Sequence, residues 1–319
     1  MDIVLETLDF SDKFILPASS KKVGYVSMNA EIQFCDNGSF ELVFINPEME
    51  QFVKAHPEGM LVLWGKFQGY MTDFQFTKNE KRIFGSHLNA MLHKAVFPPQ
   101  TITQASGDVR TILYNLIGLY IPWLKAEPST ESFGTVTYET DTYKAADSFI
   151  QEILSKMQLG FTVYMEDRTL YFGIRRPKQN PIVLSENNRN ITDFQEDFSN
   201  KTVAYGGWYK KTKEDSGTEV DPPVWTYISS ADKAGIFKQD VVLSAESPTA
   251  AADELAGYVA EHTFDCKTRN LDFGTDYGLG DVLRFQTGSS MAHKQVTGIS
   301  LWLEGSTYHE EPTLNNWEV

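Results

Sequence analysis

The sequence has little cysteine and no long apolar run. Of its 319 residues, only Cys35 and Cys266 are cysteines. Two thiols so far apart give neither a disulfide framework nor a metal-binding pattern, and we interpret both as small, half-buried apolar side chains. No stretch approaches the roughly 18–20 apolar residues of a membrane-spanning helix, so we expect no membrane-spanning segment.

The N-terminal sequence MDIVLETLDFSD lacks the basic and apolar regions of a secretory signal peptide. We therefore expect the chain to be made and folded in a cytoplasm. Disorder is excluded, because 41% of the residues are hydrophobic and 13% are aromatic, which is ample material for folded cores. At roughly 100–200 residues per domain, the length indicates two or three domains.

Basic residues are also scarce, and the formal net charge is −15. Residues 181–319 hold 11 basic and 22 acidic residues, so most of this excess lies in that part of the chain. An acidic surface repels phosphate groups, which argues against sequence-specific nucleic-acid binding. Two explanations of the charge stay open: simple solubility, or a surface over which DNA passes without sticking.

Residues 1–97 predict a first β-barrel-like module. Polar and apolar residues alternate over 26–34, the period of a strand, and a turn cluster from Asp36 to Ser39 follows. Short strands at this spacing are typical of a barrel or sandwich. The other elements expected in this module are strands over 40–45, 61–66, 70–77 and 82–85 and a short helix over 47–55.

Residues 98–180 predict an α+β module with two helices and a hairpin. The first helix begins after Asp108, carries apolar residues at helical spacing and stops before Pro122. The second covers about 143–157, and we expect Gly160 to be its C-cap. A hairpin over 161–174 completes the module.

Residues 181–319 predict a second β-rich module with one helix at about 249–263. The charged segment 210–223, KKTKEDSGTEVDPP, has no core-forming residues, so we expect a loop there and the most mobile part of the chain. The predicted fold class is therefore α+β and β-rich, with two β-barrel-like modules flanking a small helix-containing α+β module.

The sequence offers no recognisable catalytic motif, and we predict no catalytic residues. A GxSxG serine elbow is absent. Asp272-Phe273-Gly274 spells the magnesium motif of kinases, but the other kinase motifs are missing. Glu196 and Asp197, considered as paired carboxylates, are neighbours and would point to opposite sides of a strand. The prediction is that the protein is not an enzyme.

Metal and cofactor sites are likewise not predicted. His262 and Cys266 are four residues apart, but a zinc site needs three or four ligands. Asp272, Asp276 and Asp281 suggest calcium, yet glycines lie between them, as in turns, and the spacing is not that of an EF-hand. The scattered histidines complete the set that we considered as ligands: His56, His87, His93, His262, His293 and His309.

Aromatic residues are plentiful, and most are expected in the cores of the β modules. Exposed aromatics also bind sugars or partner proteins. Trp225, beside the charged segment, and Trp317, near the C-terminus, are the predicted interface anchors. The six tryptophans are Trp64, Trp123, Trp208, Trp225, Trp302 and Trp317.

An ordered set of local patterns resembles the siphophage tail-tip or baseplate hub family, which corresponds to the N-terminal part of tail-associated proteins and is related to the hubs of contractile tails. Each pattern is weak alone, but together they span nearly the whole chain in order. The patterns are GSFELVFIN, LVLWGKFQGYMTDFQFT, FGSHLNAMLHKAVFPP, GDVRTILYNLI, LGFTVYMEDRTLYFGIRRP, IVLSENNRNITDFQEDFSNKTVAYGG and DYGLGDVLRFQ with VTGISLWLEGSTYHEEPTL behind it.

The resemblance implies a structural protein of the virion tail tip, assembled in the bacterial host cytoplasm. It implies a homotrimer in which each subunit contributes two similar β-barrel modules. That pseudo-sixfold ring extends or closes the tail tube and docks onto the distal tail ring. DNA passes through its lumen, and the further implied partners are the tape-measure protein and tail fibre or receptor-binding proteins.

Two alternatives remain open from the sequence. One is a tail-associated cell-wall hydrolase, since many relatives carry a C-terminal extension with such a domain, whereas this chain stops soon after its last strands. It would need catalytic groups converging in a cleft. The other is a carbohydrate-binding receptor module, whose signature would be exposed tryptophans around Trp208 and Trp225.

Overall fold

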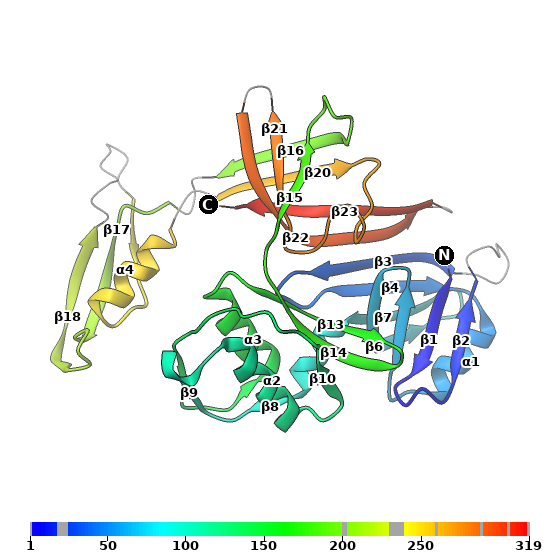
Figure 1. Cartoon of the computed structure of the whole chain (residues 1–319), viewed down its shortest axis with the longest axis horizontal. Coiled ribbons are helices and arrows are strands. Elements are labelled where there is room, and N and C mark those ends of the chain that lie inside the picture. The colour runs from blue at the N-terminus through cyan, green and yellow to red at the C-terminus, as the bar shows by residue number, and fades with distance from the viewer. Residues whose placement is uncertain are drawn as a thin grey trace. The chain divides into compact units, whose positions relative to one another are not determined.

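The structure, a computed structural model, describes residues 2–17, 25–199, 203–229, 239–258, 261–287, 290–304 and 307–317. It is β-rich with a few short helices, and this confirms the predicted α+β class (Figure 1). The chain forms two compact units. The first comprises Met1–Phe194 and Asp265–Val319, and the second comprises Gln195–Phe264.

The N-terminal part of the first unit is an antiparallel sheet with one helix at its edge. The alternation over residues 26–34 places Met28, Ala30 and Ile32 in the core and leaves the residues between them on the other face. The elements are β1 (Ile3–Thr7), β2 (Lys13–Leu16), β3 (Tyr25–Gln33), β4 (Ser39–Phe44), α1 (Pro47–Ala55), β5 (Met60–Trp64), β6 (Phe67–Phe76) and β7 (Lys81–His87).

The C-terminal strands of the first unit continue the same sheet. β22 pairs antiparallel with β3 from Gly298 opposite Gln33 to Trp302 opposite Asn29, so segments far apart in the sequence share one ladder (Figure 1). These strands are β15 (Gln179–Leu184), β16 (Ile191–Ser199), β20 (Glu261–Thr268), β21 (Val282–Thr287), β22 (Ser290–Glu304) and β23 (Thr307–Asn316).

The strand order runs along one path, β16-β20-β23-β22-β3-β4-β7-β6-β5-β1-β2, with β21 and β15 branching off at β22. No closed barrel was found among the described residues, so the barrel-like part of the predicted fold is not confirmed. The physical reason is visible at β22. One of its edges pairs with β3 instead of closing a barrel within its own group of strands.

In the sequence, the predicted helical segment lies between these two groups of strands. Asp108 caps α2, as expected, and its carboxylate accepts hydrogen bonds from the backbone of Arg110, Phe133 and Gly134. The elements are η1 (Leu88–Lys94), β8 (Val96–Phe97), β9 (Gln100–Ile102), η2 (Gln104–Ser106), α2 (Val109–Tyr120), β10 (Leu124–Ala126), β11 (Tyr138–Thr140), β12 (Lys144–Ala145), α3 (Ala146–Ser155), β13 (Gly160–Glu166) and β14 (Thr169–Arg175).

The expected role of Gly160 as a helix C-cap is wrong. The helix ends earlier, Gln158 takes the left-handed conformation with φ +53°, and Gly160 begins β13. A Cβ at Gly160 would lie 2.5 Å from the ring of Phe34. Glycine is therefore required because the strand passes close to Phe34, which the local sequence does not reveal.

The second unit is a three-stranded sheet in the order β18-β17-β19 with one helix. It consists of β17 (Gly206–Lys213), β18 (Glu219–Ser229), β19 (Asp240–Val242) and α4 (Pro248–Ala256). Its small core joins Tyr209, Leu243, Ala251 and Leu255.

Two expectations about the second unit need correction. The helix expected over 249–263 ends at Ala256, where Gly257 is the C-cap, and Glu261–Thr268 form β20. The loop expected over 210–223 is mostly a β-hairpin with Lys213 opposite Glu219. Its charged side chains pair instead of packing, with Lys211 Nζ 2.8 Å from a carboxylate oxygen of Glu214. The mobility of this segment stays a prediction.

The side chain of Phe34 lies where three parts of the first unit meet. Phe34 directly follows β3, and its side chain is almost fully buried. It contacts Gly160 of the helical segment and Gly280 beside β21. Gly280 has a φ of +83°, and a Cβ there would lie 2.2 Å from the Phe34 ring. Both the backbone conformation and the space therefore require glycine.

Replacing Gly280 with alanine should lower the free energy of unfolding by roughly 2–4 kcal/mol, from left-handed strain plus overpacking. Urea unfolding followed by tryptophan fluorescence measures it. Gly118→Ala is the matched control, because Gly118 lies within α2 with nothing near its Cβ position. That variant should gain roughly 0.5–1 kcal/mol. Equal effects of the two substitutions would contradict the role of Phe34.

Candidate functional site

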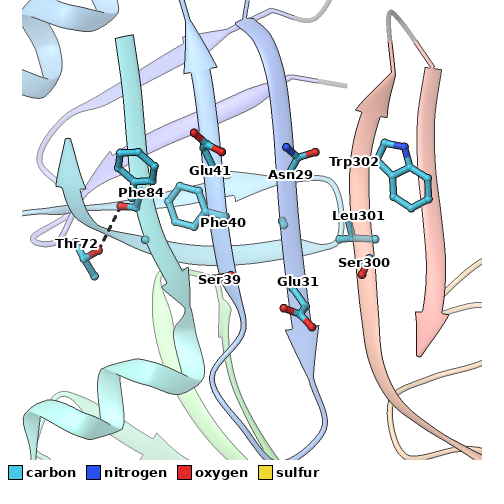
Figure 2. A pocket seen from close by; sticks show the side chains of 12 residues that line it. Asn29, Glu31, Ser39, Phe40, Glu41, Thr72, Phe84, Ser300, Leu301 and Trp302 are labelled. Carbon is cyan, nitrogen blue, oxygen red and sulfur yellow. Dashed lines mark hydrogen bonds between the residues drawn. The ribbon is translucent and has the colours of Figure 1, made fainter. Parts of the chain in front are cut away.

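A groove of about 570 Å³ crosses the sheet of the first unit where β22 meets β3. Figure 2 shows its lining side chains, which come from β22, β3, β4, β6 and β7. Segments near both ends of the chain thus build one surface. The lining residues are Asn29, Ala30, Glu31, Ser39, Phe40, Glu41, Thr72, Phe84, Gly85, Ser300, Leu301 and Trp302.

Strand alternation decides which side chains face the groove. Directly opposed residues on four neighbouring strands form one row, consisting of Trp302, Asn29, Glu41 and Phe84. Their neighbours along the strands, such as Ala30, Phe40 and Leu301, also touch the groove but are almost fully buried. The pattern apolar inside and mixed polar outside therefore continues across the joint.

Carboxylates dominate the charge of this face. Arg82 donates hydrogen bonds to Glu80 at 3.0 Å and to Glu41 at 2.7 Å, and these carboxylates, Glu80 first, raise the pKa of its guanidinium. Glu31 accepts a hydrogen bond from the Gln33 amide at 2.9 Å, and it pairs with no cation among the described interactions. The one guanidinium is thus shared by two carboxylates, and the face keeps an acidic balance.

The groove is lined by carboxylates, hydroxyl groups and aromatic rings. None of its lining residues is a histidine, lysine or cysteine, and its ionisable side chains are the carboxylates of Glu31 and Glu41. The Thr72 hydroxyl donates a hydrogen bond to the carbonyl oxygen of Phe84 at 3.5 Å (Figure 2). Trp302 stacks on His309, with ring centroids 5.2 Å apart and planes 13° from parallel.

The histidines that the sequence raised as ligands do not gather in the part of the chain that the structure describes. No group of three or more histidine, cysteine, aspartate or glutamate side chains suited to a metal ion occurs among those residues. His56 lies near Asp12 and Glu58, and His293 lies opposite Arg284 in the sheet. The side chains of His262 and Cys266 lie outside the described residues, and their backbone is in β20, not in a helix.

His93 and Asp147 form a polar pair, with Nδ1 of His93 3.0 Å from a carboxylate oxygen. The aspartate is buried and also accepts hydrogen bonds from the Asn37 amide and the Ser148 backbone, whereas 71% of the histidine side chain is exposed. A buried carboxylate that is hydrogen-bonded in this way holds η1 against α3. We assign it a structural role.

The acidic residues of the turn after β20 do not converge on a common point. Asp276 accepts a hydrogen bond from the backbone of Asp272, and Asp281 accepts from the backbone of Gly278 and the amide of Asn180. These are hydrogen bonds within a turn, as the intervening glycines indicate. In β16, Asp197 accepts from Gln195, and the side chain of its neighbour Glu196 lies outside the described residues.

The tryptophans divide into buried and exposed groups. Trp64 is fully buried, whereas Trp208 and Trp225 in the second unit are 46% and 55% exposed. Trp317 is half-buried and lines a pocket of about 430 Å³ together with Cys35. Burial raises the pKa of the Cys35 thiol to about 11, so this cysteine is an apolar packing group, as predicted.

Sequence reasoning missed most of the groove. The polar alternation at Asn29 and Glu31 was visible, but nothing local indicates that Ser300 and Trp302 lie beside them.

No helix in the described part of the chain is long and apolar enough to span a membrane.

No protein-family model and no curated protein sequence matches the chain. Solved structures do match. The 43 kDa tail protein of prophage MuSo2 from Shewanella oneidensis aligns with a TM-score of 0.56 at 11% identity, over 99% of this chain and 98% of that one.

Two further tail proteins are similar over nearly their full lengths. The tail protein from Neisseria meningitidis MC58 gives a TM-score of 0.56 at 12% identity and covers 99% of this chain and 96% of that one. Prophage tail protein gp18 from Listeria monocytogenes EGD-e gives 0.52 at 14% identity and covers 99% and 95%. The chain therefore has the fold of tail proteins, and the predicted resemblance is confirmed at the level of fold.

His87 makes the stability of this fold depend on pH. It is buried, its Nδ1 accepts a hydrogen bond from the Asn89 backbone, and burial lowers its pKa from 6.5 to about 4. Between these two pKa values, His87 is protonated in the unfolded chain but neutral in the folded chain. The free energy of unfolding should therefore fall as pH decreases from 6.5 to 4, by roughly 3 kcal/mol from this group.

His87→Asn keeps a side-chain acceptor for the Asn89 N–H and removes the titration. Its free energy of unfolding, measured by urea unfolding at several pH values, should decrease less steeply over this range than that of the wild type. Parallel curves for the two proteins would show that His87 is not the group responsible.

Proposed function

We propose that the chain is a structural protein of a phage or prophage-derived tail, the hub at the tail tip. In this proposal three copies form a ring that extends or closes the tail tube and docks onto the distal tail ring. The observation that carries it is the β22–β3 ladder, which joins two groups of strands from the two ends of the chain into one sheet. The fold shared with prophage tail proteins supports it.

The joint is relevant because of symmetry. A subunit with two β modules side by side presents two comparable surfaces, so three subunits around a threefold axis present six. A trimer of this kind therefore matches a hexameric ring. A subunit with only one such module would have to form a hexamer to match that ring. We propose the division into residues 1–97, 98–180 and 181–319 as the modular basis of this arrangement.

The groove face is proposed to line the lumen through which DNA passes. Its carboxylates repel phosphate groups, and its one guanidinium is already paired with Glu41 and Glu80. Such a wall lets DNA pass without retaining it. The tape-measure protein and tail fibre or receptor-binding proteins are the further proposed partners, and the proposed location is the virion tail tip, after assembly in the host cytoplasm.

We propose a non-enzymatic role. The groove brings carboxylates and hydroxyls together without a histidine, lysine or cysteine in its lining, and no metal cluster occurs among the described residues. The tail-associated hydrolase, the alternative from the sequence, has no specific observation in its favour. A binding role for the exposed tryptophans of the second unit has one, because Trp208 is 46% and Trp225 55% exposed.

The oligomeric state tests the hub directly. Multi-angle light scattering at micromolar concentration should give about 108 kDa, three times the chain mass of 36.1 kDa. Because subunits that assemble in a tail can be monomeric when isolated, the same measurement is repeated with the distal tail protein added. A monomer of 36.1 kDa under both conditions would overturn the trimer.

Reversing charge in the groove should create affinity for DNA. Glu31→Lys places an unpaired ammonium on the proposed lumen wall, so the assembled protein should retain double-stranded DNA at about 50 mM salt and release it at about 200 mM. Electrophoretic mobility shift measures this. Glu139→Lys, an exposed site on β11, is the charge-matched control. Equal DNA retention by both variants would contradict a lumen role for the groove.

A further inference from the structure

The sheet of the second unit has one covered face and one exposed face. Side chains at alternate positions, such as Tyr209 and Leu243, pack against Ala251 and Leu255 of α4. Gly207 completes this face, since a Cβ there would lie 2.6 Å from Leu243. The residues between them point to the side opposite α4.

The exposed face carries a row of apolar side chains across all three strands. Val242, Trp208 and Tyr227 are directly opposed on β19, β17 and β18. Trp225 lies two residues before Tyr227 on the same face, opposite Lys210. Trp208 is 46%, Trp225 55% and Val242 71% exposed. Tryptophan and tyrosine are enriched at binding surfaces.

The aromatic rings are held in position from within the unit. The Tyr227 hydroxyl donates a hydrogen bond to Asp240 at 3.0 Å. Tyr227 reaches Asp240 across Gly206, where a Cβ would lie 2.1 Å from the hydroxyl oxygen, so only glycine permits this path. The Trp208 and Tyr227 rings are 5.1 Å apart. This face is therefore a preorganised aromatic platform, and we name Trp208, Trp225, Tyr227 and Val242 the aromatic face.

The size of the aromatic face limits what it binds. Three strands about 4.8 Å apart and four residues of about 3.4 Å each give an extent of roughly 14 by 14 Å, or about 200 Å². A stable protein–protein interface needs about 800 Å² on each partner. The aromatic face alone is too small for that, and it matches a short, flat ligand.

The charges at its rim indicate a neutral ligand. Lys210 stands beside Trp225 at one end, and Asp240 stands beside Tyr227 at the other. These two described charges of opposite sign give no net attraction for a polyanion or a polycation, but both groups hydrogen-bond to hydroxyls. Aromatic planes pack against the C–H faces of sugar rings, and charged rim groups bind their hydroxyls.

We propose that the aromatic face binds a neutral oligosaccharide, with Trp208 and Trp225 stacking on successive sugar rings and Asp240 and Lys210 hydrogen-bonding to hydroxyl groups. This activity is separate from ring formation by the first unit. Different measurements therefore test the hub proposal and the oligosaccharide proposal.

The test uses the full chain and neutral tetrasaccharides of β-1,4-linked N-acetylglucosamine, α-1,4-linked glucose and α-1,6-linked mannose. Tetragalacturonate serves as the anionic probe. Saturation-transfer NMR detects binding, and a tryptophan fluorescence titration gives Kd. At least one neutral probe should bind, and Trp208→Ala and Trp225→Ala should each weaken it at least tenfold, whereas Trp225→Phe should retain most of the affinity.

Trp123→Ala is the matched control, because Trp123 is 41% exposed in the first unit and should leave Kd unchanged. The unfolding midpoints of Trp208→Ala and Trp225→Ala should equal that of the wild type, since both side chains are exposed. The proposal is overturned by any of three results. These are no binding of a neutral probe up to about 10 mM, equal Kd values in the variants and the wild type, or loss of self-association in Trp225→Ala, which would make the face a protein interface.

Discussion

The backbone ladder between β22 and β3 is the interaction on which the first unit depends. β22 is fifteen residues long, and it pairs with β21 over its first part, with β3 over its second part and with β23 over most of its length. A strand bonded on both edges has no free hydrogen-bonding groups to satisfy elsewhere. Because of this strand, the two ends of the chain form one sheet, and the groove exists only because Ser300 and Trp302 stand beside Glu31 and Asn29.

A second constraint ties the helical segment to that sheet. The outer edge of β13 would leave N–H groups unpaired, but Phe161, Val163 and Met165 donate instead to the Phe34 carbonyl and to the amide oxygens of Asn89 and Gln68. The side chains thus act as a partner strand, which also blocks the edge against unwanted pairing. Each such bond contributes about 1 kcal/mol, and a buried N–H left without one costs more.

The sequence predicted what local chemistry decides. The alternation over residues 26–34, the helix start after Asp108 and the hairpin over 161–174 each depend on neighbouring residues, and all appear as expected. What failed depends on distant residues. Gly160 is predicted to be a helix cap, but it is required by its contact with Phe34, which lies more than a hundred residues away in the sequence. The groove could not be predicted for the same reason, since no residue near 300 encodes its pairing with residue 31.

The two units solve opposite surface problems with the same strand alternation. In the first unit, Glu31, Glu41 and Arg82 keep the outer face of the sheet hydrated and acidic, and such a face repels polyanions. In the second unit, a three-stranded sheet leaves Trp208 and Trp225 about half exposed, which solubility does not require. Strand alternation thus gives one sheet a charged outer face and the other an aromatic one, and the two faces favour different kinds of contact.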